Sequence, residues 1–388
     1  MNSGGYFYLI RVVAFSGMMR QLQYNICAAA FVIATGTSAL NAQILSDSMA
    51  VSMIKMGISN MYNLQYDEAD GIFTGLEQLY PDHPVNYLLK GIMIYYENYP
   101  LLPTSPLRQL FEDDLHKCIE LSAQKPYSIN YEAESLLTNL CARGLLLTYY
   151  TNNDLSRDVI PLTAGTYKYL KKSFDFVSVF ADFYFFTGTY DYYWEAYPRI
   201  HPVYKPLASL FPPGDRLKGL DELQKAAQQS IFVKVESYSR LTSIYTGFEN
   251  NYLLASLCSK TLTDLYPRNP LYKSDHIKNL LLLNEFDQTE NIIKDSPGNN
   301  GNAFYDAQIL IFKGIIQEKK YKNYTLAKQF YKEGISAGSL FGGYCKEYCA
   351  YGYFGLSRIC EHDGDKAGQR AYRRKGIDLT DFKEVNFD

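Results

Sequence analysis

The sequence lacks the groups of residues on which most catalytic and nucleic-acid-binding sites are built. It has only five histidines in 388 residues, and none lies at a paired metal-binding spacing with an acid or a cysteine. It contains no glycine-rich phosphate loop. The formal net charge is −3, whereas binding to a phosphate backbone requires a concentrated basic face. These absences predict a protein that is not an enzyme, needs no metal or other cofactor and does not bind nucleic acid.

Long apolar runs are also scarce, and the clearest one lies near the N-terminus. After Met18 and a single arginine, an apolar stretch runs from Ile26 to about Leu40 and is followed by the small residue Ala42. This layout is typical of a secretory signal peptide, and the stretch is too short to span a bilayer core of about 30 Å. The alternative is a buried N-terminal helix or an uncleaved anchor.

We therefore expect residues 1–42 to be a signal peptide with an upstream extension and the mature chain to begin near Gln43. The protein is then exported to the periplasm or the cell envelope, or secreted, with no membrane span in the mature chain. The removed segment carries two arginines and no acids, so the net charge of the remainder is −5.

Six cysteines follow residue 42, an even number in a compartment that permits disulfides. Most of them lie inside apolar helical patterns. Cys345 and Cys349 are four residues apart on one helical face, where disulfide geometry is poor. We expect small buried side chains rather than a disulfide framework, although a bond from either residue to Cys360 stays open.

Strand signals are nearly absent, and the positive signal is a repeated pattern of small and aromatic residues. The hexapeptides LYPDHP at 79–84 and LYPRNP at 265–270 are nearly the same. Before the first, Gly57 is followed by Ala69 twelve residues later, then by Phe73 and Pro81, and Gly91 lies 34 residues after Gly57. Comparable spacings recur at Ala255 and Pro267, at Gly314, Ala327 and Tyr331, and at Gly355 and Ala367.

These spacings resemble those of the tetratricopeptide (TPR) repeat, which has a period of 34 residues and consists of a helix, a turn and a second helix. The resemblance implies an all-α fold, a right-handed α-solenoid of about eight antiparallel helix pairs over residues 43–388. The predicted pairs are 47–80, 84–123, 128–172, 173–231, 233–266, 270–296, 301–338 and 341–379. Each pair buries its apolar face against its neighbours, so that the chain forms one array.

An aromatic and proline-rich segment near 188–215 breaks the repeat pattern, and we expect it to be an insert between two helices. It contains the only tryptophan, Trp194, with Tyr192, Tyr193 and Tyr197 close by. Stacking faces and hydroxyl groups suit an extended peptide or a sugar. The alternative is that these aromatic side chains are core and that the insert folds down onto the array.

The first helices of the pairs form the concave face in such solenoids, where peptide ligands usually bind. The register places Tyr62 and Arg240 near that face, although a solvated arginine is the more common outcome. TPR families are generally non-catalytic adaptors, and exported proteins of this kind are similar to envelope scaffold proteins of bacteria. We therefore expect a protein–protein interaction scaffold whose partner is a protein or an extended peptide.

The alternative function is a glycan-binding envelope protein that uses the aromatic region around Trp194, like the helical starch-utilisation receptors. Those receptors usually carry a lipid-anchor cysteine after the signal peptide, whereas this chain has Gln43. An enzyme ranks third, because a single catalytic glutamate leaves no recognisable pattern.

Overall fold

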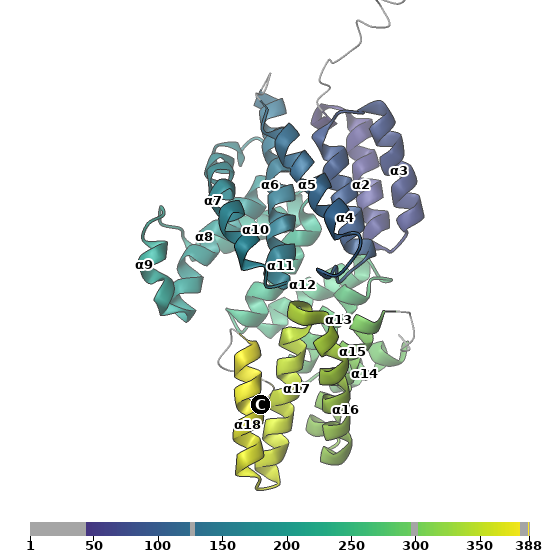
Figure 1. Ribbon diagram of the computed structural model, residues 1–388, viewed down its shortest axis with the longest axis vertical. Helices are drawn as coiled ribbons and strands as arrows, with labels where there is room; N and C mark the ends of the chain where they lie inside the picture. The colour runs from purple at the N-terminus through teal and green to yellow at the C-terminus, as the bar shows by residue number, and fades with distance from the viewer. Residues whose placement is uncertain (1–43, 125–128, 296–301, 381–386, 388) are drawn as a thin grey trace, which may run out of the picture.

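The computed structural model describes residues 44–124, 129–295, 302–380 and 387. Within these ranges all regular structure is helical and no strand occurs (Figure 1). The predicted signal peptide, residues 1–42, lies outside the described residues. Among the described residues, no helix combines the length and the apolar character that crossing a bilayer requires.

The helices pack as eight consecutive pairs, which confirms the predicted architecture. The pairs are α2 (Ser48–Tyr62) with α3 (Tyr66–Leu79), α4 (Pro84–Glu97) with α5 (Arg108–Ser122), α6 (Ile129–Asn152) with α7 (Ser156–Ser173), α8 (Phe183–Ile200) with α10 (Arg216–Gln229), α11 (Lys234–Gly247) with α12 (Tyr252–Leu265), α13 (Pro270–Leu282) with α14 (Phe286–Asp295), α15 (Ala303–Lys319) with α16 (Tyr324–Gly338), and α17 (Lys346–His362) with α18 (Lys366–Leu379). The shorter elements are η1 (Ile44–Ser46), η2 (Phe174–Phe176), η3 (Pro202–Tyr204), α9 (Lys205–Ala208) and η4 (Ser339–Cys345).

The two similar hexapeptides each end one pair and begin the next. The second helices α3 and α12 end at the leucine of each hexapeptide, and α4 and α13 begin at its last proline. His83 Nδ1 accepts a hydrogen bond from the Val85 amide at 3.2 Å, and Asn269 Oδ1 accepts one from the Leu271 amide at 3.0 Å. Proline suits the first helical position because the N–H that it lacks would have no partner within the helix.

Glycines and alanines at the repeat positions let the two helices of a pair approach closely. A Cβ added at Gly57 would overlap the ring of Phe73, and one added at Gly314 would lie 2.6 Å from the ring of Tyr331. Three of the repeat alanines, Ala69, Ala255 and Ala327, are fully buried. Gly91 faces Leu115, and Pro81 and Pro267 lie in the turns after α3 and α12.

The register of the last pair differs from the predicted one by one residue. Ala367 is exposed, whereas a Cβ at Gly368 would lie 2.9 Å from Cys360 Sγ on α17. In each of the last two pairs, the small residue of the second helix therefore lies one position further from the glycine of the first helix than it does in the pair that contains Gly57 and Ala69. Gly355 packs against Tyr331 of the preceding pair instead of a residue of α18.

The insert expected near 188–215 is shorter in the structure. Residues 183–200 form helix α8, and only 201–215, with η3 and α9, connect it to α10. The two helices pair because Gly188 and Gly219 bring their backbones together: a Cβ at Gly188 would lie 2.8 Å from the Gly219 carbonyl oxygen. The aromatic residues of α8 thus belong to an ordinary member of the array.

The array curls until distant pairs touch, so that the first pairs lie beside α11 and α12, with the last pairs below them (Figure 1). Asn269 Nδ2 donates to the Tyr62 carbonyl at 3.0 Å, which joins α13 to α2. At the other end of the curl, the Tyr344 hydroxyl donates to the Leu101 carbonyl at 3.1 Å. One buried apolar cluster accordingly combines residues of α4, α5 and α6 with residues of α13, α15 and α17.

Candidate functional site

A groove of about 470 Å³ lies on the inner side of the array. Its walls come from α2, α4, α6, α8, α11 and α13 or from residues that flank them, and these are the first helices of the first six pairs. We call this hollow the inner groove. Its lining is mainly aliphatic and aromatic, with few charged side chains.

Tyrosines form one wall of the inner groove where the first and sixth pairs meet. The Tyr62 ring lies 5.1 Å from that of Tyr96, edge to face, and 6.1 Å from that of Tyr272. Tyr266 contacts the other side of Tyr62, with ring centroids 5.3 Å apart. Edge-to-face pairs of this kind add about 0.5–1.5 kcal/mol beyond area burial, so the wall is held in one arrangement.

Glu236 is a carboxylate with an incomplete set of partners in this wall. The Tyr62 hydroxyl donates to its Oε1 atom. Its Oε2 atom is buried and has no hydrogen-bond partner among the described residues, and neither has the hydroxyl of Tyr272. Burial raises the pKa of Glu236, although the hydrogen bond from Tyr62 lowers it in part. Glu236 Oε2 and the Tyr272 hydroxyl are therefore two buried polar atoms of the groove wall without a partner among the described residues.

A histidine and a glutamate in contact with each other line another part of the inner groove. His83 Nε2 contacts Glu134 Oε1, and the Leu45 amide donates to Glu134 Oε2 at 2.8 Å. The carboxylate of Glu134 thus has structural partners on both oxygens.

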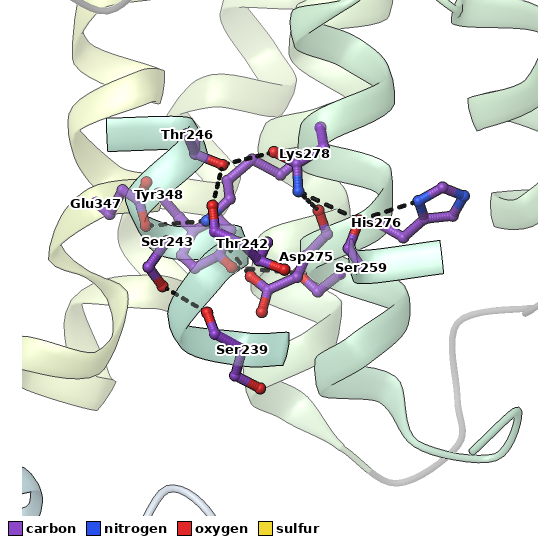
Figure 2. Close-up of polar contacts among 12 residues, drawn as sticks. Ser239, Thr242, Ser243, Thr246, Ser259, Asp275, His276, Lys278, Glu347 and Tyr348 are labelled. Carbon is purple, nitrogen blue, oxygen red and sulfur yellow. Dashed lines mark hydrogen bonds and ion pairs between the residues drawn. The ribbon is translucent and has the colours of Figure 1, made fainter. Parts of the chain in front are cut away.

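A buried lysine, Lys278, lies on α13, the helix that also carries Tyr272. Figure 2 shows Lys278 with Asp275, which is on the same helix and lines the groove, and with Glu347 on α17. The Lys278 amino group lies 3.3 Å from an oxygen of each carboxylate. Burial lowers the pKa of Lys278, but Glu347 and Asp275 outweigh it and hold this pKa well above its usual value. One ammonium group therefore serves two carboxylates.

Polar contacts also join both helices of the fifth pair to the sixth pair (Figure 2). Ser259 contacts His276 Nδ1 at 3.2 Å, and burial lowers the pKa of that histidine to about 4. Thr246 donates to Asn279 Oδ1 at 2.8 Å. These contacts fix α13, and with it Tyr272 and Asp275, relative to α11.

The structure places two of the six predicted ligand-binding residues, Tyr62 and Arg240, in the lining of the inner groove. The Arg240 guanidinium lies over the rings of Phe185 and Tyr193, at 5.9 and 5.8 Å. Tyr193 therefore supports a groove residue without lining the groove itself.

The other three predicted residues lie away from the groove. Tyr192 is fully buried and donates to Glu249 at 2.6 Å. Trp194 is half-buried and donates its Nε1 proton to the Ala208 carbonyl at 3.0 Å, and Tyr197 packs on the rings of His201 and Tyr204. Trp194 and Tyr197 hold α9 and the connecting segment against α8, whereas Tyr192 joins α8 to Glu249, just after α11.

The sequence reasoning missed Glu236, Tyr272 and Asp275. Glu236 lies four residues before Arg240 and hence on the same helical face, so the register that selected the arginine would also have selected it. Tyr272 and Asp275 face the groove only because α13 lies next to α2, a contact that no local pattern records.

Among the described residues, no group of three or more histidine, cysteine or acidic side chains is placed to hold a metal ion. The six cysteines after residue 42 are free thiols. Four of them are buried, namely Cys118, Cys345, Cys349 and Cys360.

No family model matches the sequence, and no curated protein does. Among solved structures, the chain is similar to the C-terminal part of a TPR repeat-containing protein from Cytophaga hutchinsonii, with 11% identity. The alignment covers 84% of this chain and 95% of that chain, with a TM-score of 0.28. A likeness at this level carries no argument about function.

Proposed function

We propose that this protein is a non-catalytic scaffold of TPR type that binds a segment of a partner protein in its inner groove, after export to the cell envelope. One observation carries the proposal: the first helices of six successive pairs converge on a single, mainly apolar hollow. Hollows of several hundred Å³ that combine apolar walls with a few polar groups are typical ligand sites.

The groove suits a peptide segment better than a compact metabolite. It draws on six helices spread from Ile44 to Asp275, so its contacts are distributed along the curl of the array. The polar atoms of the inner groove are few, and aliphatic and aromatic side chains lie between them. This arrangement suits an extended peptide, whose successive side chains point in alternating directions.

The alternative, a glycan platform around Trp194, has less support. Tyr192 is buried, and the indole N–H of Trp194 already has a backbone partner. A sugar site needs both exposed ring faces and available donors.

A groove-filling variant tests the proposal. Ser243 lines the groove with an exposed side chain, so Ser243→Trp occupies the hollow without disturbing the core. We expect peptides selected from a displayed library on the wild-type protein to lose about tenfold or more in affinity for this variant. Ser336→Trp, at an exposed position of α16, is the matched control and should bind normally. Equal binding by all three proteins would contradict the groove as the binding site.

The proposed export has its own test. Mass spectrometry of the protein from its native host should find a mature N-terminus near Gln43. A chain that retains residues 1–42 would contradict cleavage.

A further inference from the structure

The charges of the inner groove are unequal. The lining contains three carboxylates, Glu134, Glu236 and Asp275, and one arginine, Arg240. Glu134 contacts His83 and accepts a hydrogen bond from the Leu45 amide, and Asp275 shares Lys278 with Glu347. Glu134 Oε1 is also buried without a hydrogen bond, but it lies against His83 Nε2, whereas Glu236 Oε2 is buried with neither a hydrogen bond nor an ion-pair partner among the described residues.

A second observation concerns a tyrosine on α13. Tyr272 on α13 is only 5% exposed and lines the groove, and its hydroxyl has no hydrogen-bond partner among the described residues. Leaving a buried polar group unpaired destabilises the folded protein. Neither group has a partner within the described part of the chain, so a ligand in the inner groove would supply one.

The chemistry of the wall selects the ligand group, because a carboxylate oxygen accepts hydrogen bonds and favours a positive charge. Arg240 is the one cation in the lining, and its guanidinium lies over two rings on the α8 side. The negative charge of Glu236 is therefore not paired with a cation of the groove lining.

We propose that the partner segment presents a lysine or arginine side chain, whose charged end binds Glu236 while its aliphatic stem packs on the tyrosine wall. This inference rests on the proposed function and specifies the chemistry of the partner. The ligand cation donates to Glu236 Oε2, and the hydroxyl of Tyr272 gains a ligand partner beside it. The long apolar stem of such a side chain fits the aliphatic lining.

The experiment uses the library-selected peptides and two matched changes. In each peptide the basic residue is replaced by norleucine, which keeps the stem and removes the charge. In the protein, Glu236→Gln keeps the shape and removes the charge, and Glu290→Gln on α14 is the control. We expect norleucine to weaken binding to the wild-type protein about tenfold or more. The effect should shrink to less than about threefold in Glu236→Gln and persist in Glu290→Gln.

The outcomes separate this inference from the proposed function. Peptides that depend on the groove but carry no basic residue, or whose basic residue is indifferent to Glu236→Gln, would overturn the cation site and leave the scaffold intact. If no selected peptide loses affinity for Ser243→Trp, both the cation site and the proposed function are overturned. The norleucine comparison on the wild-type protein remains decisive if Glu236→Gln does not fold.

Discussion

At the scale of single residues, buried carboxylates fix segments that the sequence places far apart. Asp182, just before α8, is fully buried and accepts hydrogen bonds from three successive amides, those of Ile231, Phe232 and Val233, at 2.9, 2.7 and 3.0 Å. These three amides precede α11 and would otherwise lack partners within that helix. The carboxylate therefore serves as a cap supplied from another helix pair.

Removing this cap should destabilise the protein. We expect Asp182→Ala to lower the free energy of unfolding by about 3 kcal/mol, because it leaves buried amides unpaired. Urea unfolding followed by circular dichroism measures the change. Asp175→Ala is the matched control, since Asp175 lies in the same segment but is exposed, and it should change stability by less than about 0.5 kcal/mol. A similar loss in both variants would contradict the capping role.

The ionisation of Glu236 should make stability depend on pH. Burial raises its pKa above the usual value of 4.5. A group with a raised pKa in the folded state stabilises that state below its unfolded pKa, and this contribution is lost as the pH rises through the folded-state pKa. The free energy of unfolding of the wild type minus that of Glu236→Gln should therefore increase as the pH falls from about 8 towards 4.5.

Glu290→Gln is a control for which stability should depend on pH in the opposite direction. The hydrogen bond from Lys320 lowers the pKa of Glu290, so its contribution to stability is present above 4.5 and is lost as the pH falls below that value. Urea midpoints measured across the pH range follow both differences. If the free energy of unfolding of the wild type, relative to that of Glu236→Gln, instead increased with rising pH, burial would not be the dominant influence on the pKa of Glu236.

At the scale of elements, glycine pairs decide how closely two helices approach. A Cβ at Gly188 would lie 2.8 Å from the Gly219 carbonyl oxygen and 2.9 Å from the Cβ of Glu222. The first of these neighbours is backbone, which cannot move aside as a flexible side chain can. The backbones of α8 and α10 are thus in direct contact. This contact makes the aromatic-rich helix α8 the first helix of a pair in the array.

We expect Gly188→Ala to destabilise the protein by about 1–3 kcal/mol through overpacking, even though alanine favours helix formation. Gly71→Ala is the opposite case, since nothing lies within 4 Å of its added Cβ on α3. There the gain in helix propensity should stabilise the protein by up to about 1 kcal/mol. Thermal unfolding of both variants measures the two effects, and a stabilised Gly188→Ala would show that α8 and α10 can separate without cost.

At the scale of the whole molecule, contacts between successive turns of the array distinguish it from an open solenoid. In an open repeat array each unit touches only its neighbours, and stability is a sum of local terms. Here Asn269 is 2% exposed and links α13 to the carbonyl of Tyr62, and Lys346 pairs with Asp154 at 2.7 Å. These links couple the first half of the chain to the second.

The cap residue Asn269 should therefore matter more than a cap that acts only within its own helix. We expect Asn269→Ala to cost about 2–3 kcal/mol, because it removes both an N-cap and the partner of a carbonyl in the first pair. Asn251→Ala, which removes the cap on the Leu254 amide, should cost about 1 kcal/mol. Hydrogen exchange should also speed up around Tyr62 in Asn269→Ala but not in Asn251→Ala. Equal costs and unchanged exchange there would contradict the coupling between turns.

Part of the fold and of the site followed from local patterns. The small residues at Gly57, Ala69 and Gly314 predict helix pairs because close helix contacts exclude larger side chains. The same logic missed the one-residue shift at Ala367, since turn length is not recorded in the spacing of small residues alone. The register of a single helix was enough to place Tyr62 and Arg240 in the groove.

The sequence by itself determined that this chain is an array of helix pairs, because small residues recur at several helix crossings, and His83–Pro84 and Asn269–Pro270 each mark the start of a helix. Only the tertiary structure decided that the array curls until α13 touches α2. That contact combines many weak packing terms over residues distant in sequence, and no local pattern encodes their sum. It brings Glu236 and Tyr272 into one wall, and so it creates the site for which the proposed partner must carry a positive charge.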